Sequence, residues 1–294
     1  MSSAVFSTSA ARSRHFIFDA ESAPETGPDL RRPQSTVKNR QSTILSNVVP
    51  ASQLEVRPAP QMVSSGIAAL DALTGGLPRG CLTEICGPAS SGRTTLLLAA
   101  LAAATQRGEF CAVVDASDAL NPQSVAYSDV ELGRLLWVRC GENTLPKQNL
   151  PKEKKTFKSE QQYAEHSLEQ LLHATDLLLE SGGFGLIALD LGDLPPQTAR
   201  RIPLTTWFRF RRAVEHTPTV LLSIERQSIA GSCSSLLLKL ESHRIEPTNL
   251  PASVPVHTQL LTELKITAEI VRSRMERQPP CSEITFAGKT AWAG

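Results

Sequence analysis

Short apolar runs alternate with longer amphipathic segments along most of the chain. Five runs have the length and composition of buried strands, at residues 82–86, 110–114, 135–139, 186–190 and 220–224. Helices are predicted between them, at residues 93–107, 161–180 and 204–215. Parallel strands need crossover helices, and strands buried on both faces are apolar throughout. The order therefore predicts an α/β fold with a mostly parallel central sheet covered on both faces.

The last part of the chain has strand-like runs with no long helix between them. These runs lie at residues 235–241, 264–272 and 282–286. Consecutive strands without a crossover helix pair antiparallel. We therefore expect antiparallel C-terminal strands that extend the central sheet.

Composition divides the chain into a core and less ordered segments. Residues 1–62 are interrupted by prolines and show no apolar period, which predicts a flexible N-terminal tail. The core is expected to span residues 63–289, and residues 290–294 form a short tail. Within the core, residues of about 143–160 include five lysines and are predicted to be a solvated insertion, with attraction to DNA as the alternative.

The charge balance narrows the classes of function. Lys and Arg total 30 against 29 Asp and Glu, which gives a formal net charge of +1. A protein whose whole surface covers nucleic acid is usually more basic, so the balance argues against a DNA-coating protein but allows a local basic patch. The longest strongly apolar stretch, residues 96–104, is too short to cross a bilayer.

The cysteines indicate a reducing compartment. They form no CxxC pair and no cluster with histidine, which favours reduced thiols in the cytoplasm over a zinc site. The six residues are Cys81, Cys86, Cys111, Cys140, Cys233 and Cys281.

A glycine-rich loop between the first strand and the first long helix is typical of phosphate binding. Glycines let consecutive N–H groups point into one concavity, and the helix N-terminus adds the positive end of its dipole. The predicted nucleotide-binding residues are Gly87, Pro88, Ala89, Ser90, Ser91, Gly92, Arg93, Thr94 and Thr95. Thr94 stands where a hydroxyl would hold Mg²⁺, so the expected ligands are ATP and Mg²⁺. The alternative is a loop that no longer holds nucleotide.

Arg93 occupies the position at which such loops normally carry lysine. Arginine keeps the positive charge and bonds phosphate strongly, but its planar fork is bulkier than an ammonium group. Binding of a triphosphate should therefore survive this change better than stabilisation of the transferring charge.

Several motifs resemble those of the bacterial RecA family. They lie at residues 64–66, 70–71, 75–80, 84–95 and 114–122, with a weaker likeness through residues 187–190 and the late strands. The resemblance covers residues 63–289 and is specific over the first sixty of these. It implies a RecA-like P-loop NTPase core, in which Asp190 matches the family's Mg²⁺-associated aspartate.

Three functional positions depart from the RecA pattern. The glutamate that activates the attacking water is replaced by Ser117, with the adjacent Asp118 a weak candidate base. Glu225 and Arg226 replace the Asn-Gln pair whose glutamine senses the γ-phosphate. The long DNA-gripping loop after that pair is reduced to residues 227–231. We therefore expect slow ATP hydrolysis at most.

This combination is similar to that of the ImuA-type proteins, which are divergent RecA paralogues. The resemblance implies a non-recombinogenic accessory factor in DNA repair and SOS mutagenesis. Its partners would be RecA and a Y-family-like polymerase subunit of translesion synthesis at damaged DNA, and a homo-oligomer is possible. The alternatives are a DNA-dependent ATPase recombinase that binds single-stranded DNA, and a structural interaction module that binds no nucleotide.

An arginine–aromatic segment at residues 198–215 is the candidate DNA or partner surface. Arginine neutralises phosphates, and an aromatic ring can stack on an unpaired base. The alternative is a surface helix with its aromatic side chains on the sheet and its arginines in solvent. The candidate residues are Arg200, Arg201, Trp207, Arg209, Arg211 and Arg212.

Overall fold

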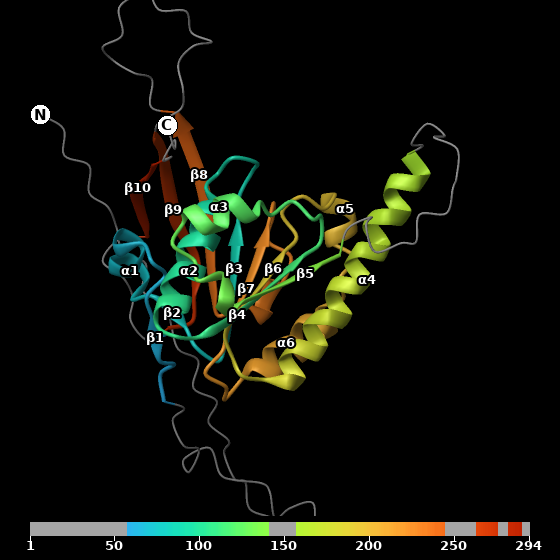
Figure 1. Ribbon diagram of the computed structural model, residues 1–294, viewed down its shortest axis with the longest axis horizontal. Coiled ribbons are helices and arrows are strands. Elements are labelled where there is room, and N and C mark those ends of the chain that lie inside the picture. The colour runs from blue at the N-terminus through green and yellow to red at the C-terminus, as the bar shows by residue number, and fades with distance from the viewer. Residues whose placement is uncertain (1–57, 141–156, 245–262, 276–281, 290–294) are drawn as a thin grey trace, which may run out of the picture. The chain divides into compact units, whose positions relative to one another are not determined.

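Eight strands form one sheet within the described residues, in the order β10–β9–β8–β3–β7–β6–β4–β5 (Figure 1). The structure is a computed structural model that describes residues 58–140, 157–244, 263–275 and 282–289, all within a unit spanning Arg57–Gly294. The strands are β3 (Cys81–Cys86), β4 (Phe110–Asp115), β5 (Leu135–Arg139), β6 (Phe184–Asp190), β7 (Val220–Glu225), β8 (Leu236–Arg244), β9 (Glu263–Ser273) and β10 (Glu283–Lys289). A separate antiparallel pair consists of β1 (Met62–Val63) and β2 (Leu77–Pro78).

The sheet is parallel over most of its width. Strand β3 pairs in parallel with β7 and β8, and β6 pairs in parallel with β4 and β7, while β4 also pairs with β5. The pairs β8–β9 and β9–β10 are antiparallel. This topology confirms the predicted α/β fold, a mostly parallel sheet extended by antiparallel strands.

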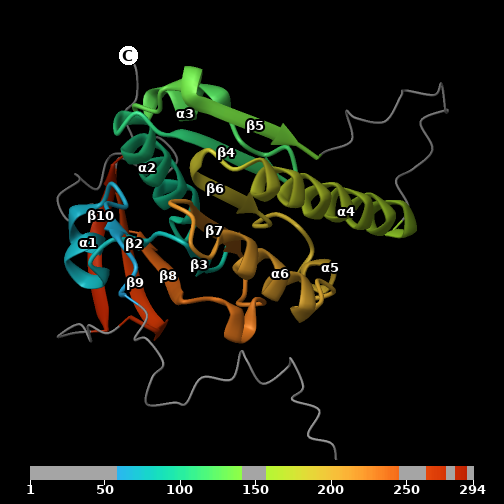
Figure 2. The same cartoon turned by 90° about the horizontal axis from the view of Figure 1, so that it is seen from below.

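Helices cover both faces of the sheet (Figure 2). Helices α1 (Ala68–Thr74), α2 (Arg93–Gln106) and α3 (Pro122–Tyr127) lie on one side, and α4 (Phe157–Ser181), α5 (Pro196–Ala199) and α6 (Leu204–Val214) on the other. Alternate residues of β4 serve the two layers, with Cys111 and Val113 in the core under α2, and Ala112 and Val114 in the core under α4 and α6. Burial on both faces explains why the strand is apolar throughout.

Helix α4 begins earlier than its hydrophobic pattern predicts. Its first residue is Phe157, so its first turn lies inside the predicted insertion of residues 143–160. Three of the first four residues are polar, and a polar turn gives no periodic signal. The rest of the insertion, residues 1–57 of the predicted tail at 1–62, and the tail at 290–294 lie outside the described residues. Met62, at the end of the predicted N-terminal tail, pairs with Pro78 in the β1–β2 ladder.

No helix in the described part of the chain is long and apolar enough to span a membrane. Cys281 lies outside the described residues, and the other five cysteines are free thiols. Burial raises the pKa of the Cys111 thiol to about 12 and that of Cys86 to about 11, so both are protonated at neutral pH.

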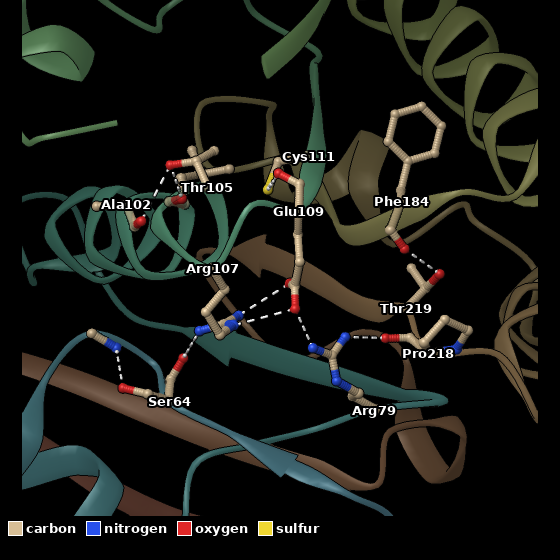
Figure 3. A network of polar contacts seen from close by, with 12 residues as sticks. Ser64, Arg79, Ala102, Thr105, Arg107, Glu109, Cys111, Phe184, Pro218 and Thr219 are labelled. Carbon is tan, nitrogen blue, oxygen red and sulfur yellow. Dashed lines mark hydrogen bonds and ion pairs between the residues drawn. The ribbon is translucent and has the colours of Figure 1, made fainter. Parts of the chain in front are cut away.

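A polar network joins loops at the amino ends of the parallel strands (Figure 3). Glu109, at the start of β4, accepts two 3.2 Å hydrogen bonds from Arg107 and forms an ion pair with Arg79. Arg79 also donates to the carbonyl of Pro218, and Arg107 donates to the carbonyl of Ser64 at 3.3 Å. The carboxylate thus connects segments far apart in the sequence, at the sheet end opposite to the glycine-rich loop.

Glu109→Gln is expected to lower the free energy of unfolding by about 1 kcal/mol at neutral pH, because two charge-assisted contacts are lost. Burial acts to raise the pKa of Glu109, but hydrogen bonds from Arg107 and Arg79 outweigh it and lower the pKa below its ordinary 4.5. The stabilisation is therefore complete above the unfolded-state pKa and is lost as the pH falls through the folded-state pKa. Urea unfolding of both proteins should show the difference at neutral pH and a smaller one near pH 3. A difference independent of pH would contradict this role.

Candidate nucleotide-binding site

The glycine-rich loop connects β3 to α2 and is held by the neighbouring strands. The Gly87 N–H donates to the Glu225 carbonyl at 3.2 Å, and the Ser242 hydroxyl donates to the Ser90 carbonyl at 2.6 Å. Ser90 and Gly92 have left-handed backbone conformations, with φ of 62° and 95°. The loop thus turns sharply into the helix, as phosphate binding requires.

Two glycines are needed for the close packing of this loop. A Cβ on Gly87 would lie 2.4 Å from the Leu240 carbonyl oxygen, and one on Gly92 would lie 2.4 Å from Cδ1 of Ile266. Real Cβ atoms do not approach other atoms so closely. Residues of β8 and β9 therefore pack directly against the glycine-rich loop.

The start of α2 fits a bound phosphate. Gly92 is the N-cap residue and provides no side-chain cap, so the first-turn N–H groups and the helix dipole remain for an anion. Thr94 and Thr95 are exposed, as are Pro88, Ala89 and Ser90, whereas Ser91, Gly92 and Arg93 are buried. The Ser91 hydroxyl is buried without a hydrogen-bond partner among the described residues. A bound ligand could supply the missing hydrogen bond.

Arg93 turns inward toward the end of β6. Its guanidinium donates to the Gly192 carbonyl at 3.4 Å, and only 8% of the residue is exposed. Arg226 donates to the same carbonyl at 3.0 Å and lies 3.9 Å from Asp193. Two guanidinium groups therefore share one oxygen, an arrangement that an anion between them would stabilise.

Asp190 ends β6 beside this arginine pair. Its Oδ1 accepts the Gly192 N–H at 2.9 Å, and a Cβ on Gly192 would lie 3.0 Å from both Asp190 Oδ1 and Arg93 Nη1. Burial raises the pKa of Asp190 to about 6, although the hydrogen bond from Gly192 acts in the opposite direction. A carboxylate here and a hydroxyl from Thr94 are oxygen donors of the kind that Mg²⁺ prefers, so the residues present fit this ion.

The candidate base is engaged elsewhere. Ser117 is exposed just after β4, and its N–H donates a 3.1 Å hydrogen bond to the Asp115 carboxylate. Asp118 has a left-handed φ of 54° and binds the Arg139 guanidinium through both carboxylate oxygens. Both carboxylate oxygens are thus occupied by Arg139, so this geometry does not favour Asp118 as the group that activates water.

Trp207 requires a correction, because it is not on the surface. Trp207 and Phe210 are fully buried, with ring centroids 6.1 Å apart in a T-shaped contact. Together with Val214 they form the stripe of α6 that packs on the sheet, while Phe208 is about half exposed. The expectation that Trp207 contacts a nucleobase or a partner protein is wrong for this fold, because its indole ring is buried in the core between α6 and the sheet.

The arginines of this segment are partly neutralised by neighbouring residues. Arg209 pairs with Asp176 at 2.8 Å, Arg201 forms an ion pair with Glu165, and Arg200 bonds Gln227. Arg212 is exposed and Arg211 is half-buried. The segment is thus a positively charged surface whose arginines bridge α5 and α6 to neighbouring elements.

Two features of the site were not predicted from sequence. One is the shared Gly192 carbonyl, which follows from the approach of the β6 and β7 ends in space. The other is a pair of buried carboxyl groups, Glu84 on β3 and Glu225 at the end of β7. An acid within an apolar strand run is the sequence signal for such a group, and both residues carry it.

Comparison with known proteins gives a partial match. Residues 48–148 match the family model of the RecA N-terminal domain. The chain is 38% identical over 132 residues to Protein RecA of Bordetella avium, covering 44% of this chain and 30% of that protein. It is 34% identical over 138 residues to Protein RecA of Kineococcus radiotolerans, covering 46% and 32%. Over 78 residues it is 50% identical to Protein RecA of Chlorobaculum tepidum, covering 26% and 22%.

These matches support a RecA-like family for the chain. The aligned segments span about a third or less of the length of the relatives. The matched segment includes the phosphate loop and α2, the elements that form most of the candidate site.

Proposed function

We propose that this chain is an accessory DNA-repair factor that binds ATP·Mg²⁺ and hydrolyses it slowly or not at all. One observation carries this proposal: the glycine-rich loop turns into α2 through left-handed Ser90 and Gly92, while Asp118, the candidate base, is bound to Arg139 through both carboxylate oxygens. The resemblance to the RecA family implies that Ser117 replaces the water-activating glutamate. The RecA-like relatives support a role related to DNA repair or recombination.

In the proposed mechanism the chain holds the triphosphate without activating water. The α2 N-terminus and the loop N–H groups would bind the phosphates, with Arg93 and Arg226 as cationic ligands. Thr94 and Asp190 would hold Mg²⁺, which neutralises phosphate charge. Phosphoryl transfer depends on positioning and charge stabilisation, and loss of the group that orients the water lowers the rate by about 10²–10⁴-fold.

The partners proposed are RecA and a Y-family-like polymerase subunit, at damaged DNA in the cytoplasm. The resemblance to ImuA-type proteins supports this finer role in translesion synthesis and SOS mutagenesis. Exposed arginines on α6, among them Arg209 and Arg212, supply positive charge for single-stranded DNA or an acidic partner surface. A homo-oligomer belongs to the same proposal, since the relatives are RecA proteins.

A single titration distinguishes the proposed function from its alternatives. The full chain is titrated with ATP·Mg²⁺, with and without single-stranded DNA, while nucleotide binding and phosphate release are both measured. We expect saturable binding and little release. Turnover strongly stimulated by DNA would instead support a recombinase-type ATPase, and absence of binding would support an interaction module.

Arg93→Ala is expected to weaken ATP binding about 10- to 100-fold, because one charge-assisted phosphate contact is worth about 1.5–3 kcal/mol. Calorimetric titration measures the affinity, and circular dichroism checks the fold. Arg274→Ala removes an exposed arginine at the end of β9 and serves as the matched control. Unchanged ATP affinity in a folded Arg93→Ala protein would show that Arg93 is not a phosphate ligand.

A further inference from the structure

Two glutamates are buried side by side where β3 and β7 end. Glu84 is 0% exposed and Glu225 is 1% exposed. In the parallel register Glu84 pairs with Ser223, and Cys86 pairs with Glu225, so the glutamates share the sheet face that also carries Leu82 and Leu221. Two ionised carboxylates in such a place would repel strongly, since neither is screened by water.

The Glu84 carboxyl group accepts hydrogen bonds from a neighbouring loop segment. Its Oε1 accepts the N–H groups of Ile229 and Ala230 at 2.5 and 3.0 Å, and its Oε2 accepts the Ser234 hydroxyl at 3.1 Å. Arg272 of β9 donates to the same hydroxyl at 3.1 Å. Three donors thus tie the segment 229–234 to β3 through the Glu84 carboxyl group.

Glu225 has the surroundings of a protonated acid. Its Oε1 accepts the Ser223 hydroxyl at 2.5 Å, and its buried Oε2 has no hydrogen-bond partner among the described residues. Burial and the charge of Glu84 raise the pKa of Glu225 well above its ordinary value. A proton on Glu225 would therefore relieve the repulsion between the two buried acids.

The backbone of Glu225 reaches the nucleotide site. Its carbonyl accepts the N–H of Gly87, the first residue of the phosphate loop. The next residue, Arg226, bonds the Gly192 carbonyl beside Arg93. Glu225 thus lies between the phosphate loop and the segment that Glu84 anchors.

We propose that the Glu84–Glu225 pair is a one-proton latch that holds the segment 229–234 against β3 and couples its position to the phosphate loop. Removal of the Glu225 proton leaves two ionised carboxylates buried on one sheet face, and they separate by releasing the 229–234 donors to water. The coupling half of this proposal rests on the proposed nucleotide binding, whereas the latch itself does not.

Other charged or titratable groups face the pair without replacing its proton. They are Cys86 on β3, Lys239 opposite it on β8, Cys233 within the held segment, Arg226 next along the chain, Arg200 across the small cavity that Glu225 lines, and Arg272 behind Ser234. Burial raises the pKa of Cys86 to about 11, so its thiol stays neutral over the range in which Glu225 titrates. The proposal therefore assigns the proton that changes to Glu225.

Amide hydrogen exchange of the full chain without nucleotide tests the latch. Protection factors at Ile229 and Ala230 are measured against pH for the wild type, Glu225→Gln and Glu84→Gln, with the exposed Glu180→Gln as control. We expect wild-type protection to fall by up to about tenfold per pH unit above the raised pKa of Glu225. Glu225→Gln should keep its protection at every pH, because an amide at residue 225 carries no charge at any pH. Glu84→Gln should lose protection throughout.

The latch and the proposed nucleotide binding can be rejected independently of each other. Wild-type protection that stays constant with pH, or equal pH dependence in Glu225→Gln, overturns the latch even if Glu84→Gln does not fold. ATP affinity measured against pH, over a range well above the pKa of about 6 of Asp190, then tests the coupling. The coupling predicts that in this range the affinity depends on pH in the wild type and is constant in Glu225→Gln. Failure of ATP to bind at all rejects the proposed nucleotide function and leaves the exchange result standing.

Discussion

Trp207→Ala is expected to lower the free energy of unfolding by about 3–5 kcal/mol, the largest single-residue effect predicted for this chain. The indole is fully buried between α6 and the sheet and packs edge-on against Phe210. Its removal forfeits the burial of a large apolar area and leaves a cavity that the surrounding helices and strands cannot fill. Loss of the aromatic pair adds to this cost.

Two further variants make the Trp207 measurement specific. Trp207→Phe should cost much less, because it keeps most of the ring and removes an indole N–H that has no partner among the described residues. Phe208→Ala, one position along and half exposed, should be close to neutral. Urea unfolding monitored by circular dichroism measures all three. A Trp207→Ala protein with full stability and weakened binding of single-stranded DNA would show instead that the ring is a contact residue.

Gly87→Ala is expected to reduce stability by about 1–3 kcal/mol and to weaken ATP binding by about tenfold or more. The added Cβ would meet the Leu240 carbonyl oxygen at 2.4 Å and the Ser91 hydroxyl at 2.5 Å. A backbone carbonyl in a central sheet cannot move aside cheaply, so the phosphate loop has to shift instead. A shifted loop no longer aims its N–H groups at one point.

Gly133→Ala is the matched control for this substitution. Gly133 has no positive φ, and a Cβ there would meet nothing within 4 Å, so the change should leave both stability and ATP affinity as they are. Thermal unfolding and calorimetric titration measure the two quantities. If Gly87→Ala binds ATP as tightly as the wild type, the loop does not form the proposed phosphate cradle.

Local pattern was sufficient for the parallel strands and for the phosphate loop. The apolar runs at β4 and β6 signal burial on both faces, and a glycine loop between strand and helix has few alternative structures. The start of α4 was missed because its first turn is polar and tertiary contacts farther along stabilise the helix. Trp207 was misplaced because the charges around it obscured the apolar stripe that it shares with Phe210 and Val214.

The near-zero net charge argued only against a DNA-coating protein. The residue order by itself determined the α/β core and a glycine-rich loop that has Arg93 where such loops normally carry lysine. These are properties of neighbouring residues, and neighbours fix periodicity, turn geometry and chemical type. Only the tertiary structure decided that Arg93 and Arg226 meet at Gly192, that Asp118 is held by Arg139, and that Glu84 and Glu225 share a buried site. Each of those contacts joins strand ends far apart in the chain, and their distances depend on the order of the strands in the sheet.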